Sequence, residues 1–438
     1  MKIAKIGFLL ICLSIAPLTT FAGQVQFSQE IKVTDFDIDA NPDPKICVSS
    51  NNKIYIVWIE NDDRSDHLYF SRSQDGGLTF EEKREIESNG DISGDPRIGV
   101  DSHGRIYIMY KELFDHLEIR LILKTSDDDG ESFQTSTIAT AGILRISLSS
   151  EDMKIIDDTI YYLMDDYLLR STDGGNNFQI ISILEDEQNT VGTVHSSSFA
   201  IDSHQNIFVV YYKGRPDSDI IDVCFAKMES GNDYFSESIV LEECDFLALL
   251  AIYKPSIIAT SAGELYVFWN NGPKNIDDLP GDRTRFPAHY TYSNDMGSTF
   301  SQIDEITFDM QPSSLKTQIM IFEAYADQND DLHFLYQYFD GLFYGKSSDL
   351  CTTFDKSIKL STEGFWSDME INGNGEIYMV WEESTNLEEN EPGHIYFTKS
   401  IEGNASDNND TSGDSGGDNG DGNAGGGCFI SNLGPAQK

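Results

Sequence analysis

Seven short apolar runs recur along the chain at a spacing of roughly 50 residues. Each run is rich in β-branched and aromatic residues, which favour strands. A shorter apolar segment and a polar turn such as 101–104 precede each run, and an apolar segment such as 67–70 follows it. The pattern predicts short antiparallel strands, and after residue 22 it contains no helical periodicity. The runs are 54–58, 106–110, 160–164, 207–211, 265–269, 332–336 and 377–381.

Four short strands in a repeat of this length are typical of one blade of a β-propeller. We therefore expect an all-β fold, a seven-bladed propeller of four-stranded antiparallel blades. The last unit ends without a fourth strand of its own, whereas residues 27–33 have the same pattern as the fourth strand at 354–360. An N-terminal strand near Gln26 to Val33 is predicted to complete the last blade, which removes an exposed sheet edge.

A turn motif, Ser-x-Asp-x-Gly-x-x-Phe, follows the third strand in most units, while units four and seven lack it. Short Ser and Asp side chains accept hydrogen bonds from turn amides, and Gly supplies a positive φ. The Phe is expected to start the next strand by burying its ring. A fifth copy has Cys351 in place of Gly. The copies are Ser73, Asp75, Gly77, Phe80; Ser126, Asp128, Gly130, Phe133; Ser171, Asp173, Gly175, Phe178; Ser293, Asp295, Gly297, Phe300; and Ser347, Asp349, Phe354.

This motif resembles the Asp-box, or BNR repeat, of bacterial sialidases and many other secreted β-propellers, and the resemblance covers most of the chain. In that family the box is a structural turn remote from the active site. The resemblance therefore implies an architecture and says little about chemistry. Substitution of Asp75 or Asp173 is expected to lower stability and to spare ligand binding.

The two ends of the chain indicate an exported protein. Residues 1–22 combine basic residues, an apolar stretch and small residues at the end, as in a cleaved secretory signal. We expect the propeller to span 23–402, in a secreted, periplasmic or cell-surface bacterial protein. Residues 403–438, rich in Gly, Asp and Asn and with Cys428 near their end, are expected to be a disordered acidic tail. Asp414, Asp418 and Asp421 leave weak Ca²⁺ binding by this tail open, and no other cofactor is indicated.

Composition narrows the class of partner. The chain has 30 Lys and Arg against 74 Asp and Glu, a net charge of −44, which repels phosphate backbones. We expect a monomer without nucleic-acid partners, and no segment after the signal is long and apolar enough to span a membrane. Cysteines are too few for a disulfide framework, although Cys224 and Cys244 fall within one unit and could pair.

Ligands of such propellers bind at the mouth where the innermost strands begin. We aligned the first strands on Ile46, Ile98, Ile146 and their equivalents and compared the residue before each. Three adjacent units offer a cation there, which suits a carboxylated or sulfated sugar; an ordinary polar rim is the alternative. Arg283 and Arg285, in the longest loop between second and third strands, would overhang the same mouth. The aligned residues are Lys45, Arg97, Arg145, Ser198, Ser256, Glu323 and Asp368.

By resemblance to sialidases, Arg97 in Pro96-Arg97-Ile98-Gly99 would be the first of three arginines that bind the sugar carboxylate, although both flanking residues differ from the family motif. The family also needs a Tyr nucleophile, a Glu and an Asp acid/base. The candidates are too many to choose between, with Tyr211, Tyr325, Glu323 and Asp115 among them. Characterised sialidase domains have six blades. We therefore favour an exported, non-catalytic binding or scaffold propeller that recognises a glycan or an exported protein, with a sialidase-like glycoside hydrolase as the alternative.

Overall fold

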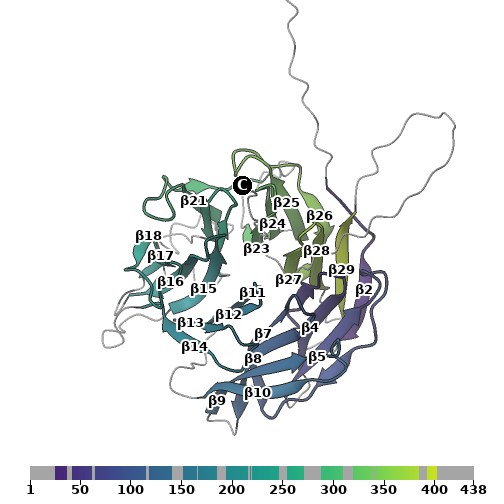
Figure 1. The fold of residues 1–438 in the computed structure, drawn as a ribbon. Coiled ribbons are helices and arrows are strands. Elements are labelled where there is room, and N and C mark those ends of the chain that lie inside the picture. The colour runs from purple at the N-terminus through teal and green to yellow at the C-terminus, as the bar shows by residue number, and fades with distance from the viewer. Residues whose placement is uncertain are drawn as a thin grey trace, which may run out of the picture.

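The structure is a computed structural model in which the described residues form seven antiparallel sheets, and no helix, around one axis (Figure 1). This confirms the predicted seven-bladed propeller. The described residues are 25–36, 42–61, 65–114, 118–140, 151–164, 166–184, 194–215, 218, 220–245, 254–270, 288–308, 319–338, 341–383 and 392–401. The predicted signal and acidic tail lie outside them.

Each blade takes its strands in chain order from the axis outward. Blades one to four contain β3 (Lys45–Val48), β4 (Ile54–Asn61), β5 (Asp66–Ser73), β6 (Arg84–Ile86); β7 (Asp91–Val100), β8 (Ile106–Phe114), β9 (Glu118–Ser126), β10 (Gln134–Thr140); β11 (Asp152–Ile156), β12 (Thr159–Met164), β13 (Tyr167–Ser171), β14 (Gln179–Ser182); β15 (Val194–Ile201), β16 (Ile207–Gly214), β17 (Ile220–Met228) and β18 (Ile239–Asp245).

Blades five to seven follow the same order, and the last takes its outer strands from the N-terminal end of the described chain. They contain β19 (Ser256–Ala259), β20 (Leu265–Asn270), β21 (Ala288–Ser293), β22 (Asp304–Glu305); β23 (Met320–Ala326), β24 (Leu332–Tyr338), β25 (Gly341–Ser347), β26 (Ile358–Ser361); β27 (Gly364–Ile371), β28 (Ile377–Glu383), β29 (Gly393–Ile401), β1 (Gln26–Phe27) and β2 (Ile31–Phe36).

The predicted closure is confirmed. Both β1 and β2 pair antiparallel with β29, with Gln26 opposite Ile401 and Ile31 opposite Phe397. Figure 1 shows the purple β2 beside the yellow-green β29. Two short strands thus share the place that one fourth strand holds in the other six blades.

The hydrophobic core is divided into seven clusters, and each lies between two neighbouring blades. Side chains of a strand alternate between the two faces of its sheet. On β4, Tyr55 and Val57 accordingly pack toward blade two, while Ile56 and Trp58 pack toward blade seven. Both faces of a blade are buried, so its second strand is apolar throughout instead of alternating with polar residues.

The repeated turn is held by hydrogen bonds of the predicted kind. The Ser73 hydroxyl donates to Asp75 and accepts from Gly77 N–H, at 2.8 Å each. The Thr79 N–H and hydroxyl both donate to the Asp75 carboxylate, at 2.9 and 2.6 Å. These bonds lower the pKa of Asp75 to about 2, the Thr79 hydroxyl contributing most. The role of the residue before Phe80 was not predicted, although Thr, Ser or Asn occupies that position in all five copies.

The turn glycine also packs against the preceding blade. A Cβ added at Gly77 would lie 2.4 Å from the Phe397 ring of blade seven, and one at Gly297 would lie 2.3 Å from Phe225 of blade four. In the fifth copy Cys351 keeps the left-handed conformation, with φ of 67°, and its N–H donates to Ser347. The turn geometry therefore survives there without glycine.

The possible pairing of Cys224 with Cys244 is wrong. Both are buried, and neither is in a disulfide. In the strand register Cys244 lies opposite Ile221, and Cys224 lies opposite Val240. The two side chains pack into different clusters on opposite faces of blade four. Because they point away from each other, they cannot form a disulfide.

Candidate functional site

The innermost strands surround a small cavity on the propeller axis. Four of the residues predicted for the mouth, Lys45, Arg97, Glu323 and Asp368, line it together. The cavity has a volume of about 50 Å³. That is room for a few water molecules and far below the ~300 Å³ at which ligand pockets usually begin.

The assignment of Arg145 to this position was wrong, because the innermost strand of blade three is β11. In blade two, Ile98 of the first strand lies opposite Ile108, and the equivalent residue of β11 is Met153, which lies opposite Tyr162. Asp152 directly precedes Met153, so Asp152 takes the place given to Arg145. The alignment had relied on an apolar residue, whereas the axis-facing positions of this strand are charged. Arg145, Arg283, Arg285 and Asp115 lie outside the described residues.

The sequence analysis missed four charged residues of the lining, Asp152, Lys154, Lys254 and Glu370. Lys254 and Glu370 stand two positions from Ser256 and Asp368 of the aligned column, and side chains two apart on a strand share one face. A search with this spacing would have found these two, whereas Asp152 and Lys154 were missed because the first strand of blade three was misplaced. Tyr325, considered above as a catalytic tyrosine, stands two positions after Glu323 and also lines the cavity.

The three lysines of the cavity are in ion pairs. Lys254 lies 2.8 Å from Glu323, and Lys154 lies 3.6 Å from Asp152. Lys45 bonds to Asp43. The lining contains four cations, Lys45, Arg97, Lys154 and Lys254, and four carboxylates, Asp152, Glu323, Asp368 and Glu370, so it is formally neutral.

Two of these carboxylates also connect neighbouring blades. Asp368 of blade seven accepts a hydrogen bond from Ile46 N–H of blade one, at 2.9 Å. Asp152 of blade three accepts from Phe199 N–H of blade four, at 3.3 Å. Innermost strands have a free edge toward the axis, and these carboxylates satisfy backbone groups on it. Part of the charged lining is therefore structural.

Tyr325 and Asp368 have perturbed proton affinities. Burial, together with the carboxylates of Glu323 and Asp368 and others nearby, raises the pKa of Tyr325 well above its usual range. Its hydroxyl donates to Glu323 at 3.3 Å. Burial and then Glu323 raise the pKa of Asp368 to about 6. Asp368 thus takes up a proton at a higher pH than an ordinary aspartate does, and the raised pKa of Tyr325 keeps its hydroxyl protonated near neutral pH.

Beyond the charged layer the axis is apolar. A second space of about 20 Å³ is lined mostly by apolar residues such as Phe199, Ile258 and Ala324, with Lys154 and Tyr325 shared between the two cavities. Tyr211, the other described tyrosine considered for catalysis, packs in the core between blades three and four. It does not line the axial cavity.

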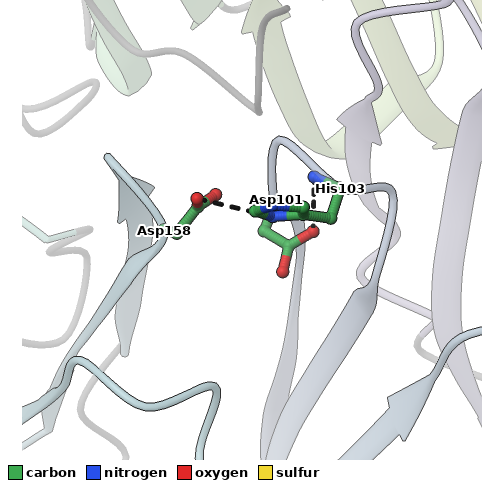
Figure 2. Close-up of side chains that lie close together, drawn as sticks. All are labelled: Asp101, His103 and Asp158. Carbon is green, nitrogen blue, oxygen red and sulfur yellow. Dashed lines mark hydrogen bonds and ion pairs between the residues drawn. The ribbon is translucent and has the colours of Figure 1, made fainter.

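A separate group of metal-type ligands is explained by turns. Figure 2 shows Asp101 and His103 on one turn near Asp158 on the turn of the next blade. Asp101 accepts from His103 N–H and Arg105 N–H, at 3.0 and 2.9 Å. Asp158 accepts from the Ser102 N–H and hydroxyl, both at 3.0 Å. Because the carboxylates are engaged by these turns, we assign no metal to them.

The described part of the chain holds no helix with the length and hydrophobicity that a membrane crossing requires. No protein-family model and no curated protein sequence matches this chain.

Solved structures do match in fold. An α-L-arabinofuranosidase of Fusarium graminearum with an iminosugar inhibitor shares 9% identity and a TM-score of 0.52, over 85% of this chain and 97% of that one. An ulvan lyase shares 13% identity and a TM-score of 0.51, over 85% and 95%. A Dyadobacter fermentans protein of unknown function shares 15% identity and a TM-score of 0.50, over 86% and 98%. At such identities the likeness is one of fold alone, and it agrees with the β-propeller architecture of this chain.

Proposed function

We propose that this protein is an exported, non-catalytic binding propeller that recognises a glycan, or else an exported protein, at its mouth. The observation that carries the proposal is the small volume of the axial cavity, about 50 Å³, whose lining includes the ion pairs Lys154–Asp152 and Lys254–Glu323. A sugar ring does not fit into such a space, so a ligand would bind above it. The charged lining then serves as a rigid polar floor.

The state of the carboxylates supports a non-catalytic role. A glycosidase needs two carboxyl groups on either side of a space for the scissile bond, or a tyrosine nucleophile in sialidases. Here Asp152 and Glu323 are paired with lysines, and Asp368 is bonded to the backbone of the next blade. Tyr325, whose pKa is raised, is a poor nucleophile.

Similar folds favour a glycan over a protein as the ligand. The matching structures include an α-L-arabinofuranosidase in complex with arabinobiose and an ulvan lyase. Fold alone does not transfer function. It does make carbohydrate the first ligand class to test.

The proposal predicts glycan binding without turnover. Purified protein should retain an oligosaccharide on a glycan array and in calorimetry, and should release no product from fluorogenic sialosides or arabinosides. Turnover that Glu323→Gln abolishes would overturn the non-catalytic assignment. Failure to bind any glycan, with capture of an exported protein instead, would leave only the second ligand class.

A sialidase-like hydrolase is the second candidate because one grouping favours it. Tyr325 and Glu323 are hydrogen-bonded, and Asp368, with a pKa of about 6, lines the same cavity beside Arg97. On this reading Tyr325→Phe should eliminate turnover of a fluorogenic sialoside, and Arg97→Ala should raise its KM. Equal background rates in wild type and Tyr325→Phe would exclude it.

A further inference from the structure

Three aromatic side chains form a connected cluster where two innermost strands begin. Phe322, on β23, is buried in the core between blades six and seven. Its ring centroid lies 6.1 Å from that of Phe365, and Phe365 lies 5.1 Å from Trp366, both edge to face. Phe365 and Trp366, on β27, are half-buried. We call Phe322, Phe365 and Trp366 the aromatic cluster.

The strands that carry this cluster have an irregular backbone. The register of β23 shifts between Ile321 and Glu323, and that of β27 shifts between Phe365 and Ser367, so Phe322 and Trp366 stand outside the regular pairing. Trp366 also has a positive φ of 20°, which is unusual for a bulky residue. Bulges commonly re-aim side chains next to functional sites, and strained residues gather at ligand sites.

The start of β27 is fixed in place. The Ser361 hydroxyl accepts from Gly364 N–H at 2.8 Å and donates to Glu383. A Cβ at Gly364 would lie 2.9 Å from Trp381, so the backbone is packed tightly against that ring. Trp366 therefore lies two residues after an anchored backbone position, which reduces the entropy lost when a ligand orders it.

The cluster is near the polar cavity along the two strands, although its three residues are not part of the cavity lining. Trp366 precedes Asp368 by two residues, about 7 Å along a strand, and Phe322 directly precedes Glu323. Aromatic surface beside a few placed polar groups is the usual make-up of a small-molecule site. The cavity lining is formally neutral and the chain carries −44, so neither attracts an anionic ligand.

We propose that Trp366 and Phe365 form a stacking platform for a pyranose ring of an uncharged oligosaccharide. The apolar C–H face of the ring packs on the indole, and its hydroxyls reach the charged groups of the axial cavity. This inference rests on the proposed function and commits it to a neutral glycan, in place of the carboxylated or sulfated sugar expected from sequence.

Tryptophan fluorescence tests the platform in the intact protein. The chain has four tryptophans, and Trp58, Trp269 and Trp381 are 0, 2 and 1% exposed. Acrylamide should therefore quench mainly Trp366. We expect cellopentaose, xylopentaose or mannopentaose to shift the emission and protect it from quenching, and 3′-sialyllactose and a chondroitin sulfate tetrasaccharide to do neither.

Variants of Trp366 test whether the fluorescence change reports the affinity for the oligosaccharide. Trp366→Ala should weaken binding of the active pentasaccharide at least tenfold by calorimetry, and Trp366→Phe should keep it within about threefold, since either ring can stack. Tyr234→Ala is the matched control, because Tyr234 is an aromatic residue 64% exposed on a turn between third and fourth strands, at the opposite end of the strands. Unchanged thermal unfolding of each variant establishes that it is folded.

The outcomes separate this inference from the proposed function. Neutral glycan binding that Trp366→Ala leaves unchanged would overturn the platform and keep the binding propeller. Binding of the anionic probes alone would likewise overturn only the choice of ligand. If wild type binds no carbohydrate, the glycan function and the platform both fail.

Discussion

Asp368 combines a structural bond with an unfavourable charge. Its carboxylate accepts from Ile46 N–H where blade seven meets blade one. Burial and Glu323 nevertheless raise its pKa to about 6, against the opposing effects of Lys45 and Arg97. The residue thus contributes more to stability when it is protonated than when it is charged.

The raised pKa of Asp368 determines how the free energy of unfolding changes with pH. Between about pH 4 and 6 the folded protein binds the Asp368 proton more tightly than the unfolded chain, so the free energy of unfolding falls as the pH rises through this window. Asp368→Asn keeps an acceptor for Ile46 N–H without the charge. We expect it to raise the free energy of unfolding at pH 7.5 by on the order of 2 kcal/mol. Urea unfolding at pH 7.5 and pH 4 measures this, and the gain should shrink toward pH 4; a loss of stability at both pH values would contradict it.

The turn glycine at position 77 offers a second test at this scale. Gly77 and Gly104 have nearly equal φ values, 85° and 86°, but a Cβ at Gly104 meets nothing within 4 Å. Gly104→Ala should cost about 1 kcal/mol through backbone strain alone. Gly77→Ala should cost roughly 1–3 kcal/mol more, since its methyl would enter the packed Phe397 ring. Equal losses in denaturant titrations would mean that the glycine does not matter for packing between blades.

At the scale of elements, cations at the end of third strands bind the repeated turn of the next blade. Arg72 donates to Asp129 O at 2.6 Å, and Lys399 donates to Gly76 O at 2.7 Å. Lys227 donates to Met296 O at 3.4 Å. In a chain with only 30 basic residues, several thus serve to join blades.

The strands differ in how well sequence predicts them. Second strands such as Ile106–Phe114 are buried on both faces, so their apolar runs stand out. The innermost strand β11 reads Asp-Met-Lys-Ile-Ile, because alternate side chains face the charged axis, and an alignment on apolar residues misplaced it. The pairing of Lys254 with Glu323 could not be predicted, since it depends on how the ring brings two blades together.

At the scale of the molecule, the ring depends on its first strands. Val25 and Phe27 pack against the core between blades six and seven, and Phe36 packs into the core between blades seven and one. Removing residues 24 to 34 should lower Tm and broaden the transition in calorimetry, because β29 loses its outer partners. Removing residues 403–438 is the control, and it should leave the transition unchanged. Identical transitions for both truncations would disprove the closure as a stabilising contact.

The pairing of β1 and β2 with β29 also sets an order of events during biosynthesis. Among the described strands, the ribosome makes β1 and β2 first and β29 last, so the partners of this one junction are separated by the synthesis of all the strands between them. Each earlier core needs only the next blade, and can assemble as that blade emerges. The last core must wait for Gly393–Ile401 to arrive. For a chain threaded unfolded across a membrane, the ring can then close only on the far side, after translocation of the seventh blade is complete.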